Sequence, residues 1–257
     1  MSKRNRPLSI AALDSVAMLG GNSAVAQDND GWSGEAAFSA GYTTGNTETT
    51  DLGLCIDVAR EQGVWTYEFV ADGEYGEQDG VESRNRYFLS GDVDRQLNDK
   101  LFAFGRTSYE VDQFTGFDSR TFVGGGVGYH IYDSEQTKWT VRAGPGVKID
   151  EVKRIVTTDS VGAALIIPAE TVSSFGAVAR SAFGHKLNDN VKFTNETDVL
   201  YGETSTQIEN MVALTASVSS AISARMSFNV RYDTNPAEGF EDTDTALKVA
   251  LVYGFGR

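Results

Sequence analysis

The chain has no run of about 18 uncharged apolar residues, which is the length that a membrane-spanning helix needs. Its mean hydropathy is -0.27 and 40% of its residues are hydrophobic. These features exclude a helical membrane protein, so a chain of this composition can cross a membrane only as a β-barrel. No Pro- or Ser-rich linker divides the 257 residues, and we therefore expect one folded domain after a short presequence.

Cysteine, histidine and positive charge are also scarce. Cys55 is the only cysteine, which excludes a disulfide framework and a thiolate metal cluster. Without further cysteines, the two histidines, His130 and His185, do not form a tetrahedral zinc pattern. The formal net charge of -14 repels a phosphate backbone, so we expect no nucleic-acid partner. We also expect no cofactor, because the sequence carries no metal or phosphate motif.

Catalytic motifs are not evident either. Gly124-Gly125-Gly126 followed by Gly128 looks like a phosphate-binding loop, but no helix and no Lys-Ser/Thr pair follows. Glycine inside a strand more often marks a bend or close packing in a barrel wall. Ser181 lies near His185 by strand alternation, which leaves an outer-membrane hydrolase of the phospholipase type as an alternative. Because no nucleophile motif accompanies them, we predict that the chain is not an enzyme.

The N-terminus has the three regions of an export signal. Lys3, Arg4 and Arg6 precede a mostly apolar stretch from Leu8 to Leu19, and Ala24-Val25-Ala26 forms a small-x-small cleavage site. We predict that residues 1–26 are a cleaved signal peptide and that residues 27–257 form the exported domain. Export implies passage through the periplasm.

From Trp32 onward, apolar and polar residues alternate with period two, which is the pattern of half-buried strands. In Trp139 to Glu151 one face carries Trp139, Val141, Ala143, Pro145, Val147 and Ile149, and the other carries Thr140, Arg142, Gly144, Gly146, Lys148 and Asp150. The same sorting recurs along the chain. It is less clear in Lys100 to Asp112 and in Thr171 to His185.

Turn signals separate about twelve alternating segments, within a range of ten to fourteen. Short polar turns at Gln62-Gly63, Asn98-Asp99, Asp133 to Thr137 and Asn188 to Asn190 interleave with longer polar stretches near Gly76 to Glu82, Gln113 to Asp118 and Asn235 to Asp242. Val152 to Glu170 is compatible with a long outer loop, a constriction inserted into the lumen, or another hairpin.

Three features favour a membrane barrel over a soluble one. The apolar face is nearly free of charge, as lipid contact requires, because Lys or Arg at mid-bilayer costs about 2–4 kcal/mol. Aromatic residues such as Trp65, Tyr129 and Tyr201 lie near segment ends, as in interfacial girdles. The last segment alternates from Leu247 to Phe255, like the C-terminal strand that outer-membrane assembly machinery recognises. We therefore predict a closed antiparallel transmembrane β-barrel in the bacterial outer membrane, with outer-membrane lipid and the barrel-assembly machinery as partners.

Several glycine- and turn-based motifs carry a family resemblance. Trp32-Ser33-Gly34, Gly41-Tyr42 with Gly45-Asn46-Thr47, Gly126-Val127-Gly128-Tyr129 and Ala143-Gly144-Pro145-Gly146 resemble those of the YdiY-like salt-induced outer-membrane proteins. The likeness covers most of Trp32 to Phe255. Since the family is a domain of unknown function, the resemblance implies fold and location but no activity.

The candidate functional residues are the charged side chains expected on the inner face of the barrel. They are Arg86, Asp92, Asp94, Arg106, Arg142, Lys148, Glu196, Asp198, Arg231, Asp233 and Lys248. About twelve strands fall between filled small barrels and open porins, so these mixed charges could interlock as a plug or line a narrow hydrated path. The leading hypothesis is a non-enzymatic outer-membrane barrel, either a narrow channel for small polar solutes or an envelope-structural protein. A soluble periplasmic ligand-binding barrel remains an alternative, and the oligomeric state is not predicted.

Overall fold

A computed structural model describes residues 31–43, 49–115, 117–153, 155–158, 164–203, 205–236 and 242–256. The predicted signal peptide, residues 1–26, lies outside these ranges. Within them the regular structure consists of β-strands. None of the described residues forms a helix that is long and apolar enough to cross a membrane.

Fourteen strands are present in the described chain, and most of them are longer than the strands of soluble sheets. In chain order they are β1 (Gly31–Thr43), β2 (Thr49–Gln62), β3 (Trp65–Gln78), β4 (Val81–Gln96), β5 (Leu101–Asp112), β6 (Phe117–Asp133), β7 (Thr137–Val152), β8 (Ile155–Thr158), β9 (Ala164–Ile167), β10 (Glu170–Asn188), β11 (Val191–Gly202), β12 (Gln207–Ser217), β13 (Ile222–Asp233) and β14 (Thr243–Phe255).

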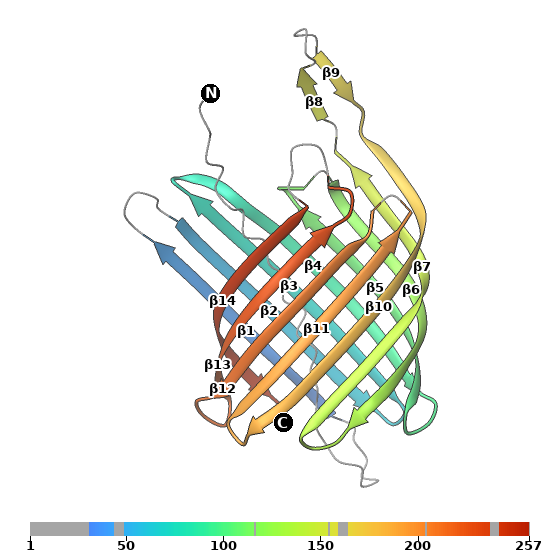
Figure 1. Ribbon diagram of the computed structural model, residues 1–257, viewed down its shortest axis with the longest axis vertical. Coiled ribbons are helices and arrows are strands. Elements are labelled where there is room, and N and C mark those ends of the chain that lie inside the picture. Colours follow the sequence, from blue (N-terminus) through green and yellow to red (C-terminus); the bar gives the residue numbers. More distant parts are fainter. Residues whose placement is uncertain are drawn as a thin grey trace.

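Twelve of these strands form a closed barrel, which confirms the predicted fold and strand number. Each strand pairs antiparallel with its neighbours in the order β1-β14-β13-β12-β11-β10-β7-β6-β5-β4-β3-β2, and the contact of β1 with β14 closes the ring. The tilted wall and the enclosed interior are visible in Figure 1. Closure leaves the barrel without a free sheet edge along the paired length of its strands.

The two faces of the wall follow the alternation seen in the sequence. In β7, Arg142, Lys148 and Asp150 are buried, whereas Val147 on the other face is exposed. In β5, whose alternation is less clear, Phe102 and Phe104 point to the same interior as Arg106. The barrel therefore encloses most of its charged side chains and exposes its aliphatic and aromatic ones, which is the reverse of a soluble barrel.

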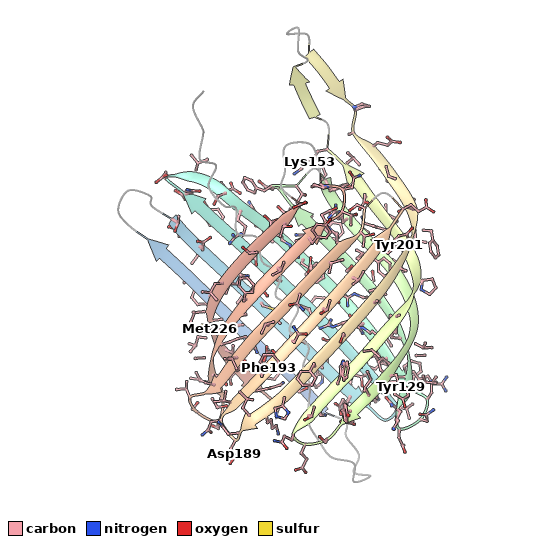
Figure 2. All side chains as sticks on the ribbon, viewed as in Figure 1. Tyr129, Lys153, Asp189, Phe193, Tyr201 and Met226 are labelled. Atoms are coloured by element: carbon pink, nitrogen blue, oxygen red, sulfur yellow. The ribbon has the colours of Figure 1, made fainter. Side chains whose placement is uncertain are left out.

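The two ends of the barrel differ in their connections. One end, here called the short-turn end, carries tight turns such as those after Gln62 and Asn188, together with Gly31 and Phe255. The other, the long-loop end, carries the connections after Thr43, Val152 and Asp233. On the outer surface Tyr129 and Phe193 lie toward the short-turn end and Tyr201 toward the long-loop end (Figure 2), as expected for two aromatic girdles.

One predicted long connection is wrong. The polar stretch near Gly76 to Glu82 is not a loop, because β3 and β4 continue through it to a two-residue turn at Asp79 and Gly80. Both turn residues have positive φ, 51° and 76°, which is the type I′ geometry that Asp-Gly favours. The polarity of this segment reflects strand ends that extend beyond the apolar band.

The segment from Val152 to Glu170 contains the hairpin β8–β9, which pairs as a separate two-stranded sheet. It projects from the long-loop end, away from the barrel (Figure 1). Of the three possibilities for this segment, the structure therefore shows a hairpin, and it stands outside the twelve-stranded wall.

Candidate functional site: the charged lumen

The interior of the barrel holds ion pairs between strands that are not neighbours in the wall. Because β5 and β13 stand opposite each other in the ring of twelve strands, a contact between them must pass through the lumen. Ion pairs of this kind show which charged side chains point inward. They define the candidate site as the lumen itself.

The cross-lumen cluster consists of Arg86, Glu110, Glu209 and Arg231. The guanidinium of Arg231 on β13 donates to Oε1 of Glu110 on β5 across 3.0 Å, and its Nε lies 3.4 Å from Oε1 of Glu209. Arg86 on β4 donates to the same oxygen of Glu110 over 2.8 Å. Arg86 also pairs with Asp72 at 3.0 Å. One carboxylate therefore ties two arginines from opposite walls together and narrows the lumen at this level.

A second group, the arginine ladder, lies nearer the short-turn end and contains most of the predicted residues. Its members are Asp92, Asp94, Arg106, Arg142, Arg180, Glu196 and Asp198. Arg142 on β7 reaches Asp92 on β4 at 2.9 Å, and Arg180 donates to Glu196 at 2.8 Å. Arg106 lies 3.8 Å from Asp92 and 3.9 Å from Asp198, so it links the two halves.

Lys148, Asp150, Arg120 and Asp233 form a third group toward the long-loop end. The Lys148 side chain is fully buried, and its Nζ lies 3.0 Å from Oδ2 of Asp150. Arg120 on β6 lies 3.4 Å from Asp150 and 3.5 Å from Asp233 on β13, a second contact between well-separated strands. The remaining predicted residue, Lys248, pairs with Glu74 of β3 at the side of the lumen beside β1 and β2.

One sector of the lumen wall is packed with aromatic rings instead of ion pairs. Phe102, Phe104, Phe122 and Val178 form a buried apolar cluster. Glycines make room for it: a Cβ at Gly128 would lie 2.0 Å from the Phe102 ring, and one at Gly146 would lie 2.4 Å from the Phe122 ring. The glycine motifs that resemble a phosphate loop thus serve close packing. We call this cluster the packed sector.

Between these groups the lumen keeps water-sized space. A cavity of about 60 Å³ is lined by residues of the cross-lumen cluster, including Glu110 and Glu209, and by Arg106, Lys148 and Asp198. That volume is large enough for a few water molecules, which polar walls of this kind hold well.

Asp57 is completely buried on the inner face of β2, and neither of its carboxylate oxygens has a hydrogen-bond partner in the described part of the chain. A buried carboxyl group in such a place is either hydrated or protonated.

The structure brings all eleven predicted residues into this interior, and it adds charged residues that the candidate set did not include. The added residues are Glu35, Asp57, Asp72, Glu74, Arg84, Glu110, Arg120, Asp150, Arg180, Glu209 and Arg225. Parity alone could have identified most of them, because most share the polar face of their segment. Parity could not predict which of these charged residues form ion pairs with each other.

The two histidines lie apart from these charges. His130 is 3.0 Å from Thr140 Oγ1, and His185 is 2.8 Å from Thr137 Oγ1. Ser181 accepts a hydrogen bond from the Trp139 indole over 3.0 Å. The histidine–serine pair suggested by alternation is therefore not formed in the described residues. Within the same residues no cluster of three or more His, Cys, Asp or Glu side chains is arranged to hold a metal ion.

Comparison with known proteins gives a family without an assigned activity. Residues 36–255 match the family described as "Protein of unknown function, DUF481". The match gives the family as one of unknown function and does not carry the narrower YdiY-like name. None of the curated proteins compared with the chain matches it.

Solved structures share the fold at low sequence identity. The translocator domain of the autotransporter NalP from Neisseria meningitidis superposes with a TM-score of 0.53 at 11% identity, covering 88% of each chain. The COG4313 outer membrane channel from Pseudomonas putida F1 has a TM-score of 0.51 at 12% identity, covering 90% of this chain and 97% of that one. At such identities the likeness establishes the fold, which is that of outer-membrane barrels, and nothing finer.

Proposed function

This chain belongs to the DUF481 family of proteins of unknown function, and from its charged lumen we propose that it is a narrow outer-membrane channel for small ions and small polar solutes. The observation that carries the proposal is the bridge from Arg231 to Glu110, which joins opposite walls and leaves water-sized space beside it. Side chains that span the lumen restrict its bore to small solutes. One of the two barrels compared above is described as an outer membrane channel, so the fold is compatible with that role.

Location and biogenesis belong to the same proposal. The outer face offers aliphatic and aromatic side chains to lipid, and the aromatic residues near both ends suit the two interfaces of a bilayer. We infer that the protein resides in the bacterial outer membrane and is inserted there by the barrel-assembly machinery. The short-turn end would then face the periplasm, as is usual for such barrels.

The lining of the lumen also predicts its ion preference. Among the described residues, eight Asp or Glu side chains and six Lys or Arg side chains are buried. Rings of carboxylates favour cations in channels. We therefore expect a weak preference for cations over anions.

The test is electrical and uses the refolded protein in planar lipid bilayers. We expect a low single-channel conductance in KCl, with a reversal potential of cationic sign under a salt gradient. Arg231→Ser removes the cross-lumen bridge and one positive charge, so it should raise the conductance and the cation preference. Glu110→Ser breaks the same bridge but removes a negative charge, so it should raise the conductance while lowering the cation preference.

The opposite signs of the two selectivity changes separate a true lumenal path from leakage around the protein. Lys138→Ser, which removes a charge at the short-turn end, is the control and should change neither quantity strongly. If the wild type and both bridge variants show no conductance although each migrates on gels as a folded, heat-modifiable barrel, the channel proposal fails. An envelope-structural role would then account better for the interlocked charges.

A further inference from the structure

In the described part of the chain, β1 and β14 stop pairing with each other before either strand ends. These strands pair only from Gly34 opposite Phe255 to Ser39 opposite Ala250. Both strands continue toward the long-loop end: β1 remains paired with β2 as far as Thr43, and β14 remains paired with β13 as far as Thr243. The seam is thus joined in its short-turn half and parted in its long-loop half.

A cavity of about 140 Å³ lies at the parted seam, and its lining comes from both faces of the wall. Ala40, Leu52, Leu247 and Val249 belong to the outward face, and Ser39, Gly41, Asp51, Gly53, Glu74, Arg84, Ala246 and Lys248 to the inward one. The cavity is therefore bordered by residues of both faces, at the level where β1 and β14 are not paired. Small residues such as Ala40, Gly41 and Gly53 leave room for it.

A chain of ion pairs stands directly behind this opening. Glu74 on β3 binds Lys248 on β14 through one carboxylate oxygen, and its other oxygen lies 3.8 Å from Nε of Arg84 on β4. Arg84 also donates to Asp51 over 3.1 Å. The Glu74–Lys248 contact joins β14 to β3, on the other side of β1 and β2, and so holds the two sides of the seam together. We call this contact the latch. Because Glu74 lies between two cations, its place also suits another anion.

We propose that the long-loop half of the β1–β14 seam is a lateral portal that takes up a phosphate-bearing membrane lipid. The acyl chain would lie against the apolar outer residues Leu247 and Val249, which are 67% and 65% exposed. The phosphate would be bound by Lys248 and Arg84 in place of the Glu74 carboxylate. Charge-assisted bonds from these two cations give the phosphate its partners and release the latch.

A photo-crosslinking experiment tests lipid entry. p-Benzoyl-phenylalanine replaces Gly41, where an added Cβ would make only an ordinary 3.6 Å contact with Asp51. The control position is Ser108, which also lies on the inward face of the wall. It belongs to β5, which is paired at this residue with both β4 and β6, so the wall is closed there. Each protein is refolded into vesicles of phosphatidylethanolamine and phosphatidylglycerol that contain radiolabelled phosphatidylethanolamine. We expect a several-fold higher yield of lipid adduct at position 41 than at position 108.

A disulfide then closes the portal. In continued register Ala40 would face Val249, so Ala40→Cys with Val249→Cys, in a Cys55→Ala background, should seal the seam on oxidation. Sealing should abolish the adduct at position 41, and reduction of the same sample should restore it, which shows that the protein was folded. The portal is overturned if the adduct yield at position 41 is no higher than at position 108. It is also overturned if forming the disulfide between positions 40 and 249 leaves the yield at position 41 unchanged.

The headgroup is tested separately with Lys248→Gln and Arg84→Gln combined. This variant should lower the adduct of radiolabelled phosphatidylethanolamine without lowering that of radiolabelled diacylglycerol, which lacks the phosphate and would meet a seam freed of the Glu74–Lys248 contact. Equal loss of both adducts, or loss of neither, would overturn the phosphate assignment. Since the experiment measures lipid contact and not conductance, its result is independent of the channel proposal.

Discussion

The packed sector and the cross-lumen cluster fill the same lumen by opposite means. In the packed sector, the rings of Phe102 and Phe122 lie against glycines of the neighbouring strands. In the cross-lumen cluster, Glu110 binds Arg86 and Arg231 beside a water-sized cavity. The packed sector gains dispersion and apolar burial, whereas the ion pairs must first offset the desolvation of each charge.

This difference indicates a division of tasks. Apolar contacts stabilise without requiring water, so the packed sector suits a rigid wall from β5 to β11. Buried ion pairs contribute little net stability compared with apolar packing of equal volume, but they keep a polar, hydratable interior. We therefore expect substitutions in the packed sector to affect stability most, and those in the cross-lumen cluster to affect permeation.

Phe122→Ala should cause the largest loss of stability. It removes a ring that is 2% exposed and contacts several strands, so the cost should be about 3–5 kcal/mol in the free energy of unfolding. Urea unfolding in detergent micelles measures it. Phe175→Ala, on the outer face and 56% exposed, is the matched control and should cost much less. Equal losses for the two variants would show that the packed sector has no special role.

Val141→Arg extends the comparison to the outer face of the wall. If Val141 reaches the midplane of the bilayer, an arginine there should cost about 2–4 kcal/mol, because lipid offers no partner for the guanidinium. The measurement is the equilibrium between folded and unfolded protein in lipid vesicles. Val141→Leu keeps the residue apolar and should be nearly neutral. An arginine variant as stable as the leucine variant would contradict the assignment of this face to lipid.

Lys138→Ala should have the smallest effect. Its Nζ lies 3.4 Å from Oδ1 of Asp133 at the short-turn end, where the Asp133 side chain is 59% exposed. Exposed pairs of this kind contribute about 0–1 kcal/mol, and added salt weakens them further. A loss of stability in the urea measurement comparable with that of Phe122→Ala would mean that ion pairs at the rim matter as much as packing in the lumen.

Much of the fold follows from local pattern. A strand places successive side chains on opposite faces, so period-two alternation predicts which residues of β7 face lipid and which face inward before any partner strand is known. The same reasoning yields about twelve strands and the closed barrel that the structure shows. It fails at Asp79 and Gly80, because polarity alone predicts a loop where two strands extend past the apolar band.

The sequence by itself determined the strands, their two faces and the inward direction of residues such as Arg231 and Lys248, because these depend on neighbours along the chain. Only the tertiary structure decided that Arg231 meets Glu110, and that β1 and β14 part beyond Ser39. These contacts join residues more than a hundred positions apart in sequence. They depend on the number of strands, their tilt and the stagger of their register, which together set the barrel's width and the way it closes.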